Sequence, residues 1–357
     1  MGNLWKPKRT RKITLQYRLQ ERPVRSVLIC GGGVAACCAA HLLRRAGIPS
    51  IVEKLARPRL PAIMLGQPTQ KILEDIFERR DLFEGCHRIQ RRVVAWVEGR
   101  DPISVPHSAV VLSEQALLDR IELRPAPNIK DVPGEPEWRI ITSHSSAGSS
   151  AEHHFGGRMA AASPVELAPA ASADSCWIES LPSGWLFLLP GGLGRGWLLA
   201  VGGPAEPLLA QSRLVVDQLG ELGRPSGLFP SHPRITEPLG GPGWLKCGSA
   251  ALSFDPLCGD GVGHAAREAI LGSAVIRSAA QRGDADSLIG HYQARLVAGF
   301  RRHLGVCSGY YRAGRRGPWW DEQLQDTLRG LEWTAQRLQA ADAPRYRLKG
   351  FALETLG

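Results

Sequence analysis

The sequence lacks the features that mark membrane and secreted proteins. Its 357 residues contain no apolar run of about 18 or more and no apolar segment near the N-terminus that resembles a secretory signal. The eight cysteines form no CxxC pair and show no spacing typical of a metal site. We therefore expect no transmembrane segment, no bound metal, and reduced cysteines that pack inside a cytoplasmic protein.

An excess of positive charge is present, but only at one end of the chain. The net charge is +10, and residues 1–25 hold eight Lys or Arg against one acidic residue, which leaves +3 for all the rest. A nucleic-acid-binding domain needs a basic surface on its folded part, so we predict no nucleic-acid partner. The tail is interpreted as a solubilising leader; contact with acidic partners or a membrane surface is the alternative.

The stretch from Ser26 to Lys54 has the pattern of a dinucleotide-binding unit. Val27–Cys30 is a short apolar run, typical of a strand buried in a parallel sheet. Gly31, Gly33 and Ala36 follow with G-x-G-x-x-G/A spacing. The first glycine permits a tight turn, the second lets a diphosphate approach the backbone, and the small third residue lets a helix pack closely on the strand.

The next helix and strand complete this unit. A helix over 35–45 stops at Gly47 and offers its N-terminal amides to phosphates. A strand over 50–52 ends at Glu53, which follows Gly31 by 22 positions. That separation is close to the roughly 20 residues expected for a carboxylate that binds an adenosine ribose. The sequence therefore predicts a bound dinucleotide.

The chain returns to a strand, a turn and a glycine-opened helix much later. Residues 243–248 read as a strand and turn, and a loop over 249–259 leads to a helix that begins near Gly261 to Gly263 and runs to about residue 281. The other expected elements are helices over 71–79, 114–121 (with Ser113 as N-cap), 211–222, 287–313 and 321–341, strands over 93–97 and 109–112, a hairpin of 185–189 with 197–201, and a mobile loop over 142–153.

Three segments together resemble FAD-dependent monooxygenases and tryptophan halogenases of the glutathione-reductase-like superfamily. The first is the glycine motif with Glu53. The second, Gly248-Ser249-Ala250-Ala251-x-x-x-Asp255-Pro256-x-x-Gly259-x-Gly261-x-Gly263, looks like the family's G-D-A-A…D-P…G-x-G segment. The third, Gly184 to Pro190, resembles the G-W-x-W-x-I-P of the halogenase branch, with Phe187 for the second tryptophan. The likeness spans most of residues 26–282.

This resemblance implies FAD as the cofactor, because a nicotinamide dehydrogenase needs only the first motif. In the family the second helix points its N-terminus at the flavin pyrimidine edge, where its partial positive charge stabilises reduced flavin. The alternative is a glycine-rich loop that only permits tight packing. The residues implied to bind FAD are Gly31, Gly33, Ala36, Glu53, Ser249, Asp255, Gly259, Gly261 and Gly263.

The implied fold is α/β, a Rossmann-like FAD-binding domain with an inserted β-rich substrate domain and a C-terminal helical segment. The predicted boundaries are a basic tail over 1–25, the FAD-binding domain over 26–124 and 243–286, the β-rich substrate domain over 125–242, and the helical region over 287–357.

Two departures from the family pattern bear on the chemistry. Ser249 replaces the aspartate that holds the ribityl chain, so its contact is weaker. An arginine that many relatives carry after Ser113 is missing, and no second Rossmann motif is present for NAD(P)H. Electrons would then come from NAD(P)H visiting transiently or from a separate flavin reductase.

Asp260 and His264 are the candidate catalytic residues, since a histidine can act as acid or base near neutral pH. The alternative is structural: Asp255 shapes the turn, Asp260 caps the helix, and His264 is a polar residue in its first turn.

The sequence therefore predicts an FAD-dependent monooxygenase acting on an aromatic or large organic substrate, either a small molecule or peptide-borne. A flavin halogenase and a degenerate FAD-binding scaffold are the alternatives. Against halogenation, Arg88 stands near the place of the halogenase lysine, and Gln67 replaces the acid of the G-E-x-T segment. Arginine stays protonated and has no lone pair with which to form a haloamine.

Overall fold

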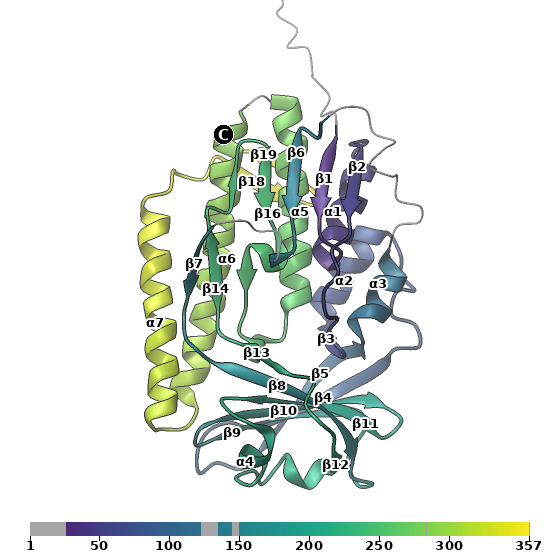
Figure 1. The fold of residues 1–357 in the computed structure, drawn as a ribbon, viewed down its shortest axis with the longest axis vertical. Coiled ribbons are helices and arrows are strands. Elements are labelled where there is room, and N and C mark those ends of the chain that lie inside the picture. Colours follow the sequence, from purple (N-terminus) through teal and green to yellow (C-terminus); the bar gives the residue numbers. More distant parts are fainter. Residues whose placement is uncertain (1–25, 123–134, 145–149, 283, 357) are drawn as a thin grey trace, which may run out of the picture.

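The computed structural model describes residues 26–122, 135–144, 150–282 and 284–356, which form an α/β fold around two large sheets (Figure 1). The basic tail predicted over 1–25 lies outside the described residues. So does most of the stretch around residue 125 where the first domain boundary was predicted.

A five-stranded sheet holds the predicted dinucleotide unit. Its order is β15 (Gly240–Gly241), β16 (Trp244–Lys246), β6 (Trp138–Ile141), β1 (Val27–Cys30) and β2 (Ser50–Glu53). All pairs are parallel except β15 with β16. Side chains such as Ile29 and Leu245 are fully buried, as expected for central parallel strands. Helices α1 (Val34–Arg45) and α5 (Gly261–Arg282) lie side by side against this sheet (Figure 1).

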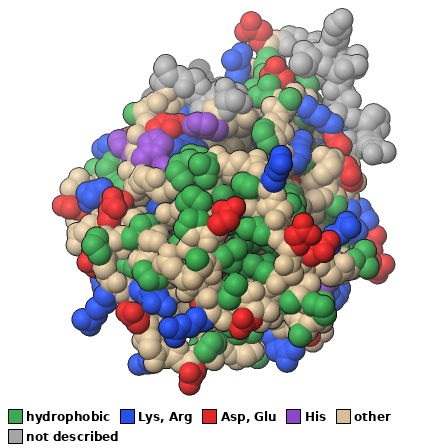
Figure 2. Space-filling view, turned by 60° about the horizontal axis from the view of Figure 1, so that its bottom comes forward, with side chains coloured by type: hydrophobic (Ala, Val, Ile, Leu, Met, Phe, Trp, Pro, Cys, Tyr) green, Lys and Arg blue, Asp and Glu red, His purple; other side chains and the backbone are tan. Residues whose placement is uncertain are grey.

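A nine-stranded sheet forms the opposite end of the molecule. Its path runs β12 (Leu219–Leu222), β8 (Met159–Leu167), β11 (Arg195–Val201), β10 (Gly184–Gly192), β9 (Ser175–Leu181), β4 (His87–Ala95), β5 (Ile103–Leu112) and β3 (Ile63–Gly66), with β13 (Leu228–Pro230) paired to β8. The predicted hairpin is confirmed, with Trp185 opposite Val201 in β10 and β11. Figure 2 brings this end forward and shows acidic and basic side chains interspersed around hydrophobic ones.

The chain passes between the two sheets more than once. Strands β3 to β5 fall within the range predicted for the FAD-binding domain, yet they join the nine-stranded sheet. Strand β6 falls within the range predicted for the substrate domain, yet it pairs with β1. The large sheet is therefore assembled from segments on both sides of residue 125.

Helices and a smaller sheet complete the fold. The helices α2 (Gln67–Phe77), α3 (Glu114–Ile121) and α4 (Ala205–Leu209) are short, whereas α6 (Ala285–Ala313) and α7 (Pro318–Gln339) are long and run side by side (Figure 1). A three-stranded sheet joins β17 (Leu252–Ser253), β14 (Arg234–Glu237) and β7 (Ala151–His154). Ser113 caps α3 as predicted, accepting the Ala116 N–H at 3.0 Å. Within the described ranges, no helix is both long and apolar enough for a bilayer crossing.

Three expectations about local structure were wrong in part. The segment 211–222 is not a helix but a loop, the short η3 (Val216–Gln218) and strand β12. The carboxylate of Glu179, buried in β9, accepts the N–H groups of Arg213 and Val215 at 2.9 Å each, and this long-range anchor overrides the local helical pattern. Of the loop expected over 142–153, residues 151–153 lie in β7, and residues 145–149 lie outside the described residues. The C-terminal region, expected to be helical, ends in a hairpin of β18 (Tyr346–Lys349) with β19 (Ala352–Thr355).

Candidate cofactor site

The first glycine motif forms a tight turn between β1 and α1. Gly31 has φ +136° and donates its N–H to the Glu53 carbonyl at 2.9 Å. A Cβ at Gly31 would overlap the hydroxyl of Thr142, so only glycine fits there. Ala36 is fully buried where α1 packs on the sheet. No side chain caps α1 in the described structure, and its first amides therefore remain available to an anion.

Two arginines that the sequence analysis did not single out lie over this turn. Arg59 Nη1 donates to the Gly32 carbonyl at 2.9 Å, and a Cβ on Gly33 would lie 2.8 Å from the guanidinium of Arg57. The buried carboxylate of Glu114 holds Arg57 with a hydrogen bond of 3.1 Å and lies 4.0 Å from Arg59. Guanidinium groups beside a helix N-terminus match the charge and shape of phosphate oxygens.

Glu53 is exposed at the end of β2, opposite Cys30 in the parallel register. The pKa of the neighbouring Cys30 thiol is raised to about 11, mainly by burial and next by the Glu53 carboxylate. The acid therefore lies directly beside the strand end from which the glycine turn begins, as a ribose-binding carboxylate requires.

The second glycine motif, which begins at Gly248, lies against the turn at Gly31, and Thr142, just after β6, contacts both. Thr142 donates its N–H to the Cys30 carbonyl at 2.9 Å, and Ser249 Oγ donates to the Thr142 carbonyl at 3.2 Å. A Cβ on Gly248 would lie 3.1 Å from the Cβ of Ala35, in the first turn of α1. The two motifs, distant in sequence, thus meet at the start of α1.

The start of α5 is packed on one side and open on the other. Asp260, just before the helix, accepts a hydrogen bond from the Thr69 hydroxyl of α2 and another from Arg267 Nη1 at 2.7 Å. A Cβ on Gly263 would overlap the Asp260 carboxylate, whereas one on Gly261 would meet nothing within 4 Å. Gly259 has φ +60° and ends the short helix η5 (Pro256–Cys258). The open side at Gly261 is where a ligand can reach the helix end.

His264 is half-buried and packs against an aromatic side chain. Its ring stacks on Phe254 with centroids 3.8 Å apart, and its backbone N–H donates to the Asp260 carbonyl at 2.9 Å. Burial lowers the pKa of His264 to about 4. The imidazole is therefore neutral at pH 7, so one ring nitrogen keeps its N–H as a hydrogen-bond donor and the other is a hydrogen-bond acceptor.

Asp255 is enclosed by protein groups. Its Oδ2 accepts from Arg158 Nη2 and from the Tyr311 hydroxyl, each at 2.7 Å, and its Oδ1 accepts the Leu257 N–H at 2.9 Å. The side chains of Arg158 and Asp255 are 1% and 0% exposed. Direct contact of this carboxylate with a cofactor would displace one of these partners, so the geometry supports the alternative role, shaping the turn before α5.

Comparisons with known proteins bear on the fold. No family model matches the chain, and no curated protein matches it by sequence. Among solved structures, the flavin-dependent halogenase CmlS superposes with a TM-score of 0.71 at 17% identity over 88% of this chain and 71% of its own. The peptidyl tryptophan dihydroxylase QhpG gives 0.69 at 19% identity over 84% and 78%.

HpxO from Klebsiella pneumoniae, solved with FAD and uric acid, gives a TM-score of 0.59 at 16% identity over 88% of this chain and 97% of its own. At such identities the likeness shows the fold. The chain has the α/β fold of FAD-dependent hydroxylases and halogenases, which confirms the fold expected from its sequence.

Proposed function

We propose that this protein is an FAD-dependent monooxygenase acting on an aromatic or other large organic substrate, free or peptide-borne. The observation that carries the proposal is the meeting of two distant glycine motifs at one uncapped helix end, with Arg57 and Arg59 across it. The fold shared with HpxO and QhpG supports it.

The residues of the site fit FAD. Glu53 would bind the adenosine ribose, and the diphosphate would lie against Gly33, the first amides of α1 and the two arginines. Ser249, beside Thr142, would bind the ribityl chain. The amides from Gly259 to Gly263 would face the flavin pyrimidine edge, where the partial positive charge of α5 stabilises negative charge. When bound, FAD supplies the activation of oxygen.

The protein's own groups then serve mainly to position and to stabilise. Asp260 is held by Thr69 and Arg267 and therefore joins α2 to the start of α5. His264, neutral and stacked on Phe254, is suited to form hydrogen bonds without taking on charge. Electrons would come from NAD(P)H or a separate flavin reductase.

A halogenase is the second candidate, favoured by the likeness to CmlS. Arg88 argues against it. This side chain is exposed on β4, opposite Val110 of β5, and arginine cannot supply the amine that halide transfer uses. Lys71 is engaged on α2 with Asp75 at 2.8 Å. Oxygen transfer needs no lysine, and it therefore remains the proposed reaction.

The test begins with an absorption spectrum of the purified protein, with and without added FAD. Binding is expected; its absence would overturn the proposal. Reduced FAD and oxygen are then supplied with a panel of indoles and phenols, with and without bromide or chloride. Hydroxylated products support the proposal. Halogenated products that survive Arg88→Ala would assign halogenation instead, and FAD binding with no product from any substrate would favour a scaffold.

A further inference from the structure

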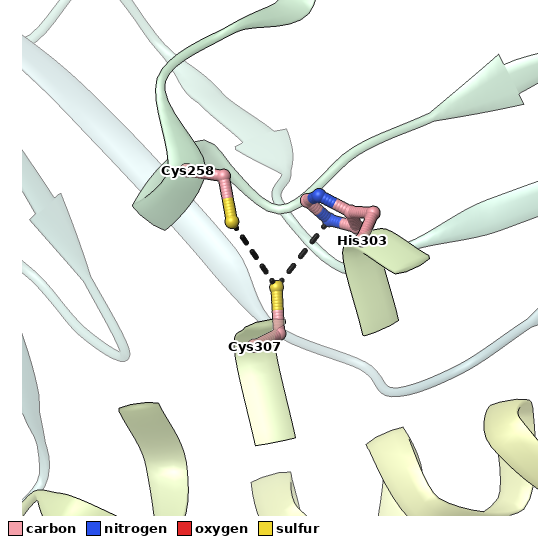
Figure 3. Close-up of side chains that lie close together, drawn as sticks. All are labelled: Cys258, His303 and Cys307. Atoms are coloured by element: carbon pink, nitrogen blue, oxygen red, sulfur yellow. Dashed lines mark hydrogen bonds between the residues drawn. The ribbon is translucent and has the colours of Figure 1, made fainter. Parts of the chain in front are cut away.

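Three side chains that the proposed function does not use meet just before α5 (Figure 3). Cys258 ends η5, while His303 and Cys307 lie four residues apart on α6 and so face the same way. The two Sγ atoms are 3.6 Å apart, and Cys307 Sγ lies 3.4 Å from Nε2 of His303. Cys258 is half-buried, and the other two residues are buried.

A metal ion is one possible occupant, since the three ligand atoms lie within 4.8 Å of one another. However, Nε2 of His303 already accepts the buried Asp255 N–H at 2.9 Å. An ion bound there would leave that N–H unsatisfied, which is costly in a protein interior. Among the described residues the cluster supplies three ligand atoms, whereas structural zinc is held by four. The geometry therefore favours chemistry between the thiols.

The surroundings shift the pKa values of the two thiols in opposite directions. Hydrogen bonding from the Cys307 thiol lowers the pKa of Cys258 to about 6 despite burial. The same contact and burial raise the pKa of Cys307. A partly exposed thiolate is the reactive form of cysteine, and a neighbouring thiol is well placed to resolve its oxidation product.

We propose that Cys258 and Cys307 are a peroxide-sensitive thiol pair that closes to a disulfide joining η5 to α6. In the first step the Cys258 thiolate attacks one oxygen of hydrogen peroxide. The O–O bond breaks, hydroxide leaves, and Cys258 becomes a sulfenic acid. In the second step the Cys307 sulfur attacks the Cys258 sulfur, and the S–O bond breaks. The hydroxyl leaves as water with the Cys307 proton.

Over both steps the two sulfur atoms together lose two electrons, and one molecule of hydrogen peroxide accepts them and becomes one hydroxide and one water. The sulfurs need to close from 3.6 Å to about 2.05 Å. The bond would tie down the residues directly before Gly259, at the start of α5. This proposal does not depend on the proposed function.

The test uses the full-length protein, reduced, desalted and treated with a small molar excess of hydrogen peroxide. Peptide mapping without reductant should show a Cys258–Cys307 link, with two of the eight thiols lost and both restored by dithiothreitol. The experiment needs only the unmodified chain, so its outcome does not depend on whether a variant folds. Absence of the link, or a link between other cysteines, would overturn the proposal.

Variants assign the two roles. Cys307→Ser should leave Cys258 as a sulfenic acid that dimedone traps, and Cys258→Ser should leave Cys307 unoxidised at the same dose. Cys86→Ser is the matched control, because Cys86 is also half-buried and contacts no second thiol within the described part of the chain. It should form the link as the unmodified protein does. A 1:1 zinc complex of the reduced protein that blocks oxidation and is lost in His303→Ala would instead establish a metal site.

Discussion

The two glycine-rich motifs meet at one site but use their side chains in opposite ways. Around Gly31 and Gly33, α1 has no side-chain cap, Glu53 is exposed, and the nearest charged groups are the arginines that cover the turn. Around Gly248 to Gly263, each acid is bound by protein: Asp255 by Arg158, Asp260 by Arg267, and Glu268 of α5 by the Gly248 N–H at 2.6 Å.

This difference separates ligand binding from self-assembly. The first motif leaves the amides of α1 and the Glu53 carboxylate for a ligand, so changes there are expected to alter affinity more than folding. The second motif uses its acids to bring loop, α2, α5 and α6 together, so changes there are expected to alter folding first. Variants of the two motifs should therefore separate stability from affinity.

Removal of the Asp255 carboxylate should be the most damaging change. Asp255→Ala leaves the buried guanidinium of Arg158 unpaired and should lower the free energy of unfolding by roughly 3–5 kcal/mol. Asp260→Ala breaks a partly exposed pair with Arg267 and removes the acceptor of the buried Thr69 hydroxyl, so it should cost less, about 1–2 kcal/mol. Urea denaturation of both variants measures the difference, and equal losses would contradict the burial argument.

Glu268 should make stability fall as pH rises. Burial raises its pKa from an ordinary 4.5 to about 8, so between these values the folded protein keeps a proton that the unfolded chain releases. Its contribution is therefore complete below pH 4.5 and is lost as pH rises to about 8, by at most about 1.4 kcal/mol per pH unit.

Glu268→Gln keeps an acceptor for the Gly248 N–H but carries no charge, so the variant should show a flatter profile of unfolding free energy against pH. Parallel profiles for the variant and the unmodified protein would show that Glu268 is not the group responsible.

Two glycines test whether backbone space matters equally in both motifs. Gly31→Ala places a Cβ at φ +136° against Thr142 and should cost about 1–3 kcal/mol of stability while weakening FAD binding. Gly261→Ala meets nothing within 4 Å and should leave the fold unchanged. Thermal unfolding and FAD titration of the two variants give both measurements. A tolerant Gly31→Ala would mean that the turn can relax.

Removal of the Glu53 carboxylate should lower the affinity for FAD without changing the stability of the fold. Glu53→Ala removes an exposed carboxylate, so the free energy of unfolding should change by less than about 0.5 kcal/mol. FAD affinity should fall by about 1–3 kcal/mol, because a hydrogen-bond partner of the ribose is lost. Fluorescence titration measures the affinity, with Glu78→Ala, an exposed acid beyond α2, as the matched control. Equal FAD affinity in the unmodified protein and Glu53→Ala would remove Glu53 from the site.

Elements with strong local signals were predictable from sequence. The strand Val27–Cys30, the helix that follows Gly33 and the cap at Ser113 depend on neighbouring residues, and the structure confirms each of them. The segment 211–222 was not predictable, because Glu179 of β9 holds its amides from far away in sequence. Nor was the exchange of β6 into the first sheet, which depends on pairing with β1.

The sequence by itself determined the first glycine turn and the acid that ends the next strand, because both follow from the spacing of residues along one short unit. The FAD-type fold was expected from the resemblance of both distant motifs to FAD-dependent monooxygenases. Only the tertiary structure decided that Arg57 and Arg59 lie over that turn. It also decided that Asp255 accepts hydrogen bonds from Arg158 and Tyr311, and that Cys258 contacts Cys307. Those contacts join segments far apart in the chain. No local pattern encodes them, because their geometry is set by how helices and sheets pack.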